Sequence, residues 1–288
     1  MKHLTLAAAL LLGTTTLTTA QDRADRSTWL YDHSETREGA LGLDGIARVR
    51  ILSHGDELQV HGLTHVDELS FVGTAWARRV QDLADVRISA YRTGNVLTLE
   101  THQPPSHQVD TRLTLRVELP DSLVVDIEDG PGSLNVKQVR RLQVDDGAGP
   151  LSIEGVAEDL VVEDGSGPVT LREIHGSVEL TDGLGDLDVQ DVGGDLELHD
   201  GQGAVRVADV DGHVNVQDGS GAIDVDRVHG NVRVRADGAG DIAVEHVRGN
   251  LVIEDDRSGR LTYGNVDGNL QLPGDHLELA DAESLQES

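Results

Sequence analysis

Residues 164–185 read DGSGPVTLREIHGSVELTDGLG and contain one full copy of the repeat that decides the fold. The copy begins at an Asp-Gly-x-Gly turn, and the next copy begins at the same turn eighteen residues later. These turns and one altered copy at the end recur in register, starting at Asp129, Asp146, Asp164, Asp182, Asp200, Asp218, Asp237 and Asp256. The successive spacings of 17, 18, 18, 18, 18, 19 and 19 residues indicate a tandem array of short repeats.

The apolar residues inside each repeat alternate with a period of two. The third copy reads Val169-x-Leu171, then a single Ile174, then Val178-x-Leu180. This alternation is typical of strands that bury one face. A helical repeat is excluded because the period is two and because glycine and β-branched residues dominate. Each repeat therefore predicts two short strands, joined by a bend with one inward aliphatic side chain and by an Asp-Gly-x-Gly turn.

Two strands of four or five residues cannot bury their apolar faces alone, but stacked copies can. A propeller blade needs roughly forty residues, so a repeat of this length fits one coil of a solenoid. The predicted fold is all-β: a single-chain parallel β-solenoid (β-helix) of about eight 18-residue coils over residues 129–272, with an irregular, strand-rich N-terminal opening.

The remaining segments differ in composition. Residues 1–20 have a basic start, an apolar run over Leu4–Leu12 and small residues before position 20, which predicts a signal peptide. Residues 21–40 are predicted to be a flexible lead-in, and residues 273–288 an acidic C-terminal tail. No later run reaches the 18 or so apolar residues of a transmembrane segment. We therefore expect an exported protein, periplasmic or extracellular.

Residues 41–128 alternate less regularly and are predicted to form a strand-rich part that caps one end of the repeats. Strands are expected near residues 47–51, 57–60, 86–90, 96–100 and 113–120, the last leading directly into the repeats. Hairpin-type turns are expected at residues 54–56 and 92–95, and a short helix at 75–83, because Trp76, Val80 and Leu83 share one helical face.

The composition restricts partners and chemistry. There are 23 Lys and Arg against 52 Asp and Glu, so the net charge is −29, which argues against nucleic acid as a partner. Cysteine is absent, which excludes disulfides, thiol nucleophiles and cysteine zinc sites. Aromatic residues are 2% of the chain, so carbohydrate binding by ring stacking is not expected in the repeats.

The turn aspartates should lie above one another at coil spacing, facing water. Each is expected to cap its own turn by accepting hydrogen bonds from the amides ahead of it. The alternative is that the column collects Ca²⁺ as a surface effect, with Asp164, Asp182, Asp200 and Asp218 as the candidate ligands. Calcium-binding nonapeptide solenoids carry a further Asp two residues after the second turn glycine, where this sequence has an aliphatic residue. No cofactor is therefore predicted.

Catalytic and metal-binding patterns are not found in the repeats. His175 and His229 share a column but lie three coils apart, roughly 14 Å at this rise, too far to ligate one ion. Ser166 and Ser220 stand in turns without a base fixed beside them. Coils of 17 to 19 residues leave no room for the long loops that form a cleft in β-helix enzymes.

The strand over Ala47–Ile51, the strand over Leu113–Pro120 and the tandem Gly-x-Gly-x-aliphatic-x-aliphatic units resemble a bacterial adhesin-like domain family of unknown function. The resemblance covers about residues 40–272 and implies an exported β-solenoid with no catalytic residues. We therefore expect a non-enzymatic structural or adhesin-like interaction module of the cell envelope, with an unknown envelope or surface partner. The alternatives are a carbohydrate-active β-helix enzyme and an acidic rod stabilised by Ca²⁺.

Overall fold

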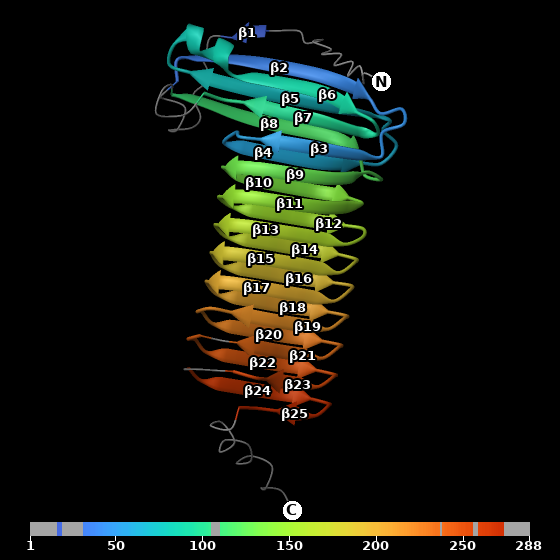
Figure 1. The fold of residues 1–288 in the computed structure, drawn as a ribbon, viewed down its shortest axis with the longest axis vertical. Helices are drawn as coiled ribbons and strands as arrows, with labels where there is room; N and C mark the ends of the chain where they lie inside the picture. The colour runs from blue at the N-terminus through green and yellow to red at the C-terminus, as the bar shows by residue number, and fades with distance from the viewer. Residues whose placement is uncertain (1–15, 19–30, 105–109, 237, 256–258, 274–288) are drawn as a thin grey trace, which may run out of the picture. The chain divides into compact units, whose positions relative to one another are not determined.

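The structure is a computed structural model that describes residues 16–18, 31–104, 110–236, 238–255 and 259–273. The chain divides into two compact units, Met1–Gly165 and Ser166–Ser288. The predicted fold class is confirmed: the chain is almost all β, with a parallel β-solenoid of about eight coils of about 18 residues (Figure 1). Apart from strand β1, Thr16–Thr18, the predicted signal peptide lies outside the described residues.

In the second unit, every coil contributes one strand to each of two parallel sheets. One sheet has the order β14-β16-β18-β20-β22-β24 and the other β25-β23-β21-β19-β17-β15. The strands of the first sheet are β14 Val169–Ile174, β16 Leu187–Val192, β18 Val205–Val210, β20 Ile223–Val228, β22 Ile242–Val247 and β24 Leu261–Val266. Those of the second are β15 Val178–Leu184, β17 Leu196–Gln202, β19 Val214–Asp218, β21 Val232–Ala236, β23 Leu251–Ile253 and β25 Leu270–Gln271.

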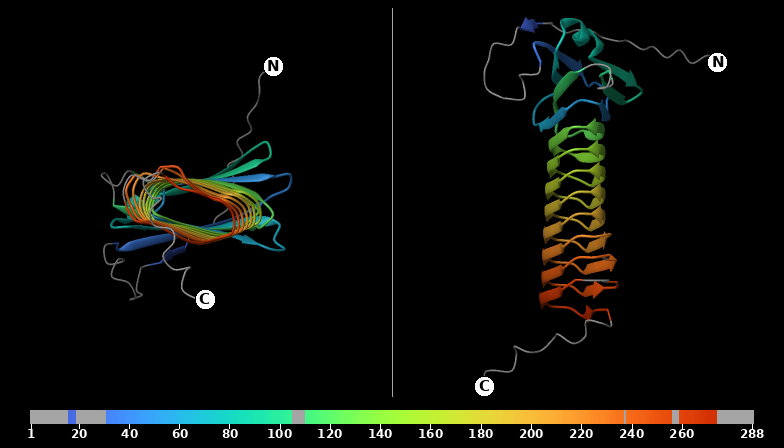
Figure 2. Two further views of the ribbon diagram at one scale, coloured as in Figure 1. Left: turned by 90° about the horizontal axis from the view of Figure 1, so that it is seen from below. Right: turned by 90° about the vertical axis from the view of Figure 1, so that its left-hand side faces the viewer.

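The register keeps equivalent residues of successive coils side by side. Val189 pairs with Val207, which pairs with Val225. The inward aliphatic residues are almost fully buried, with Val207 2% exposed and Val225 0%. Viewed end-on, these coils lie directly over one another (Figure 2). The stacked aliphatic residues form the core that the period-two alternation predicted.

The turns also stack tightly, because glycine lies on glycine. A Cβ added to Gly221 would lie 1.5 Å from the carbonyl oxygen of Gly203 in the preceding coil. At the other turn, side-chain oxygens hold the next coil. Asn231 Oδ1 accepts the backbone N–H of Asn250 at 2.8 Å, and Asn250 Oδ1 accepts that of Asn269 at 2.8 Å. Each coil therefore positions the turn of the following coil.

The first unit also has two sheets, whose strands follow a different chain order. One sheet runs β1-β2-β5-β8-β4-β10-β12 and the other β13-β11-β9-β3-β7-β6. The strands not yet given are β2 His33–Gly42, β3 Arg48–Ser53, β4 Glu57–Leu63, β5 Glu68–Ala77, β6 Arg87–Thr93, β7 Val96–His102, β8 Thr111–Pro120, β9 Val124–Pro131, β10 Ser133–Val139, β11 Arg141–Ala148, β12 Leu151–Val156 and β13 Leu160–Ser166.

The N-terminal strands form coils that are not stacked in chain order. β3 and β4 pair in parallel with β9 and β10, while β7 and β8 pair on the outer side of β3 and β4. Strand β8 therefore runs into β9 along the chain, but β4 separates it from β10 in the sheet. Beyond this coil, β6 pairs antiparallel with β7, and β5 and β2 extend the other sheet antiparallel. These antiparallel strands cover the edges of the parallel sheets in this unit.

Several local expectations are corrected. The helix expected at residues 75–83 is instead the end of β5 followed by the 3-10 helix η2, Val80–Asp85. Ala75 and Ala77 are buried in a strand, so the helical spacing of Trp76, Val80 and Leu83 was coincidental. Residues 54–56 do not close a hairpin, because β3 and β4 belong to different sheets. The hairpin at residues 92–95 is confirmed by the pairing of β6 and β7.

Strand β2 occupies residues 33–42, most of which fall within the segment that we expected to be a lead-in. It pairs with β5 over ten residues, from His33 with Ala77 to Gly42 with Glu68. The predicted C-terminal tail, from residue 274 on, lies outside the described residues.

Candidate functional site

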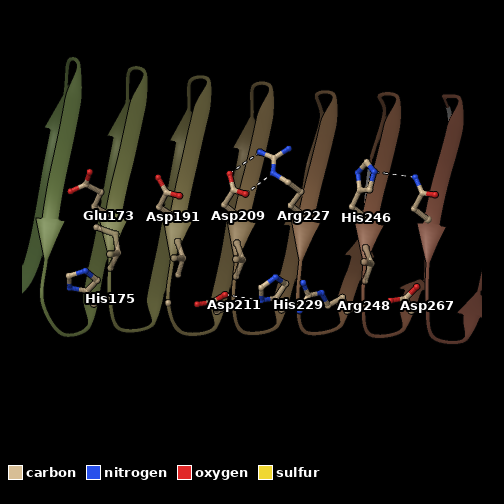
Figure 3. Close-up of a pocket in the computed structure, with 16 residues that line it drawn as sticks. Glu173, His175, Asp191, Asp209, Asp211, Arg227, His229, His246, Arg248 and Asp267 are labelled. Atoms are coloured by element: carbon tan, nitrogen blue, oxygen red, sulfur yellow. Dashed lines mark hydrogen bonds and ion pairs between the residues drawn. The ribbon is translucent and has the colours of Figure 1, made fainter.

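A groove runs along one corner of the second unit, where the first-sheet strands bend toward the next strand. It encloses about 770 Å³. Its sides are two columns of exposed residues, one on either side of a buried aliphatic row that includes Ile174 and Val192 (Figure 3). The first groove column is Glu173, Asp191, Asp209, Arg227, His246 and Asn265. The second groove column is His175, Gly193, Asp211, His229, Arg248 and Asp267.

The backbone of the first groove column is left-handed in every coil. The φ angles fall from 58° at Glu173, Asp191 and Asp209 to 52° at Asn265. A residue with a Cβ is disfavoured there by roughly 1–2 kcal/mol, and glycine would be accommodated more easily. This conformation turns the next residue, which is aliphatic, into the core, and it leaves the side chain of the column residue itself in solvent. The bend thus presents one polar side chain per coil at a fixed backbone position.

Charge is unevenly distributed along the groove. Toward the coils of β14, β16 and β18, the columns carry four acidic residues, Glu173, Asp191, Asp209 and Asp211, and one histidine, His175. Toward those of β20 and β22, they carry Arg227, His229, His246 and Arg248. The groove is therefore acidic over one half and basic over most of the other, in a chain whose net charge is −29.

The two halves meet in a pair of close contacts. Arg227 donates through Nε and Nη2 to the two carboxylate oxygens of Asp209, at 2.6 and 2.8 Å, and it also contacts Asp226. The hydrogen bond from Arg227 lowers the pKa of Asp209. In the second groove column, His229 Nδ1 lies 2.9 Å from Asp211 Oδ1. These exposed pairs contribute little to stability, but they fix the side chains at the centre of the groove.

His246 is held between two neighbours. Its Nδ1 lies 2.8 Å from a carboxylate oxygen of Asp226, and its Nε2 lies 3.2 Å from Asn265 Nδ2. Because a carboxylate only accepts hydrogen bonds, Nδ1 donates to Asp226, and the side-chain amide of Asn265 lies beside Nε2. The ring is thus oriented along the groove.

The aspartate column lies inside the solenoid, which corrects the expectation that these carboxylates face water. The described members are 2–7% exposed: Asp129, Asp146, Asp164, Asp182, Asp200 and Asp218. Each occupies the third inward position of its strand, as in Val178-x-Leu180-x-Asp182. Asp146 pairs in register with Asp129 and Asp164, and Asp200 with Asp182 and Asp218. Asp237 and Asp256 lie outside the described residues.

Burial changes the acidity of these carboxyls. Burial first, and then repulsion by the neighbouring aspartates, raise the pKa of Asp146 and of Asp200 to about 7. Burial raises the pKa of Asp129 to about 6. Backbone amides of the turn oppose the shift, and at Asp218 the Oδ1 atom accepts the N–H of Ser220 at 3.0 Å. The predicted turn capping is therefore found at Asp218.

The cation candidates Asp164, Asp182, Asp200 and Asp218 thus stand in the core and not on a surface that an ion reaches from solvent. Among the described residues, no three or more His, Asp or Glu side chains are grouped so as to hold a metal ion. His175 and His229 lie on the same side of the groove, separated by the coils of Gly193 and Asp211.

Sequence reasoning did not single out the groove. The signal was present, because every repeat of the second unit puts its lone aliphatic residue between two polar or glycine positions: Glu173-Ile174-His175, then Asp191-Val192-Gly193, then Asp209-Val210-Asp211. The left-handed backbone could not be read from these residue types.

No protein-family model and no curated protein matches the chain. Solved structures do resemble it. A "putative cell adhesion protein" from Clostridium sporogenes has a TM-score of 0.28 and 12% identity, over 83% of this chain and 99% of the other. A "putative adhesin" from Parabacteroides merdae has a TM-score of 0.35 and 11% identity, over 82% and 96%. A "putative lipid binding protein" from Parabacteroides distasonis has a TM-score of 0.34 and 11% identity, over 83% and 97%.

In the part of the chain that the structure describes, there is no helix with the length and apolar character needed to cross a membrane.

Proposed function

We propose that this chain is an exported, non-enzymatic, adhesin-like β-solenoid that acts as an interaction module of the bacterial cell envelope, and that the groove is its binding surface. The observation that carries the proposal is the pair of exposed groove columns, which repeat a polar side chain in successive coils along a line. A partner that is itself extended could contact several coils at once, at a spacing of about 4.8 Å per coil.

The backbone of the first groove column supports this assignment. Six successive coils hold a residue with a Cβ in the left-handed region, although Gly155 shows that glycine fits the equivalent position of an earlier coil. The side chains of Glu173, Asp191 and Arg227 are exposed, so they add no contact to the core of the fold. The residues are therefore better explained by what they present to solvent.

Export is supported by the composition of residues 1–20, which stays a prediction. The non-enzymatic part is supported by the sequence of the repeats, which lacks a nucleophile-and-base pattern and leaves no room for the loops of a cleft.

The experiment compares two double variants in retention assays on bacterial envelope extract. Asp191→Ala/Asp211→Ala removes two exposed carboxylates from the groove. Glu179→Ala/Asp224→Ala removes two exposed carboxylates from outward positions that do not line it. We expect a component that wild type and the control variant retain and the groove variant loses. Equal retention by both variants would contradict the groove as the binding surface.

A further inference from the structure

The order of charges along the groove has a symmetry that matters for partner choice. In the first groove column, three acidic residues are followed by Arg227, His246 and Asn265. Reading the column backwards therefore places a basic or amide residue opposite each acid. Asp209 comes opposite Arg227, Asp191 opposite His246, and Glu173 opposite Asn265.

The second groove column has the same property. When the second groove column is set beside the same column in reverse order, Asp211 comes opposite His229, and His175 comes opposite Asp267. In the remaining pair, Arg248 comes opposite Gly193, which has no side chain. No pair in either column brings two like charges together.

A twofold rotation about an axis across the groove produces this reversal. When two copies face each other about such an axis, each column meets the same column of the other copy, running in the opposite direction. This is the isologous arrangement of most homodimers, in which one surface patch contacts its own copy. Here the axis passes between the coils of Asp209 and Arg227, so their ion pair and its symmetry mate form the centre.

We propose that the occupant of the groove is a second copy of this chain, bound antiparallel through the two groove columns. The inference rests on the proposed function of the groove as a binding surface and names its partner. It accounts for how a chain of net charge −29 can associate with itself. Elsewhere two acidic surfaces repel, whereas along this strip each copy offers the charge that the other lacks.

The outer pairs distinguish contacts between copies from contacts within one copy. Asp191 and His246 are three coils apart, which is roughly 14 Å at a coil spacing of about 4.8 Å. Within one chain they cannot form an ion pair. Between two copies in the proposed register they face each other, and the pair occurs twice.

A charge exchange tests the register by sedimentation equilibrium over a concentration series. The wild type should be a dimer that dissociates as salt is raised, because exposed charges are screened. Asp191→Arg alone would face His246 of the other copy, and His246→Asp alone would face Asp191, so each should weaken the dimer about tenfold or more. The double variant Asp191→Arg/His246→Asp restores opposite charges and should regain the dimer.

These substitutions suit the backbone, because this column already holds Arg227 at φ 56° and His246 at φ 54°. Unchanged thermal unfolding of each variant, at a protein concentration where wild type and variants are all monomeric, confirms that only association is affected. Glu179→Arg is the control, because Glu179 is exposed outside the groove and should leave the dimer intact. A monomeric wild type, or a double variant as weak as its singles, would overturn the proposal.

A disulfide provides an independent test, because the chain has no cysteine of its own. Asp191→Cys/His246→Cys places two thiols too far apart to bridge within one chain, since a disulfide needs Cα atoms within about 7 Å. Oxidation should therefore yield a covalent dimer on a non-reducing gel. Glu179→Cys/Arg233→Cys is the matched control, three coils apart on the other sheet, and should stay monomeric. Equal cross-linking of the two would count against the proposed contact.

The two proposals fail in different ways. If the wild type is monomeric but the groove variant Asp191→Ala/Asp211→Ala loses an envelope component, the groove binds another partner and the dimer is wrong. If the charge exchange restores the dimer but no component is lost, the dimer stands and the groove has no role in envelope binding.

Discussion

Asp200 lies directly beside Asp218 in the parallel register of β17 and β19, and the two residues are only 7% and 3% exposed. Two carboxylates so placed cannot both ionise without cost, because both lose hydration and they repel each other. Protonation of one carboxyl removes this cost. Burial and the neighbouring aspartates raise the pKa of Asp200 to about 7. The core of this acidic protein thus holds protons near neutral pH.

The buried carboxyls predict that stability decreases with rising pH. For Asp146 and Asp200, the folded pKa of about 7 exceeds the ordinary aspartate value of 3.8, so the folded state binds more protons between these pH values. Stability should be highest near pH 4, fall as pH rises through about 7 and then level off. Thermal midpoints measured from pH 4.5 to 8.5 check the direction. A midpoint that increases across this range would contradict buried, protonated aspartates.

Asp200→Asn isolates one member of the aspartate column. Asparagine has the same shape and cannot ionise, so the variant should match wild type near pH 4.5 and exceed it at pH 8. The expected gain is of order 2–4 kcal/mol, from about 1.4 kcal/mol per pKa unit. Asp224→Asn, at an exposed outward position of β20, is the control and should leave the stability close to that of wild type.

Val207→Asp and Arg206→Asp test the inward and outward faces of β18. Val207 is 2% exposed and Arg206 is exposed, so the first change buries a charge among aliphatic residues and the second does not. We expect a loss of about 4 kcal/mol or failure to fold for Val207→Asp, and about 0.5 kcal/mol for Arg206→Asp. Urea unfolding measures both. Equal losses would show that the two faces are assigned wrongly.

Gly221→Ala tests the stacking of the turns. Its new Cβ would lie 1.5 Å from the carbonyl oxygen of Gly203, so the coils must separate locally, at an expected cost of about 2 kcal/mol or more. Gly264→Ala is the matched control, because a Cβ there meets nothing within 4 Å. Thermal unfolding should show a lower midpoint for the first variant and little change for the second.

Addition of Ca²⁺ tests the cation interpretation of the aspartate column. Because Asp182 and Asp218 are 4% and 3% exposed, we expect no change in the thermal midpoint at millimolar Ca²⁺. An ion that bound only the folded state would raise the midpoint with its concentration. If Ca²⁺ raised the thermal midpoint of wild type but not that of Asp182→Asn, the aspartate column would bind the ion after all.

The repeats made the stacked core predictable, and residues 164–185 show why. Their period-two alternation determines which side chains point inward, and the fixed spacing places equivalent residues in register. The same alternation puts Asp182 on the inward face with Val178 and Leu180. We expected its carboxylate to face water, because an ionised carboxylate is costly to bury, and the structure buries it instead.

Other features were not predicted from the sequence. The placement of β3 between β7 and β9, and of β4 between β8 and β10, depends on pairing between strands far apart in the chain, which local alternation does not encode. The groove depends on the left-handed backbone at Glu173 and Arg227, and neither residue type favours that region. The two groove columns are recognised only when equivalent residues of successive coils are placed side by side in register.

The left-handed bend also assigns core packing and the presentation of a side chain to solvent to two adjacent residues. Ile174, Val228 and Val247 are buried in the interior, while the residue just before each of them is a glutamate, an arginine and a histidine, respectively. Selection can therefore rewrite what this edge recognises one coil at a time, with no repacking underneath.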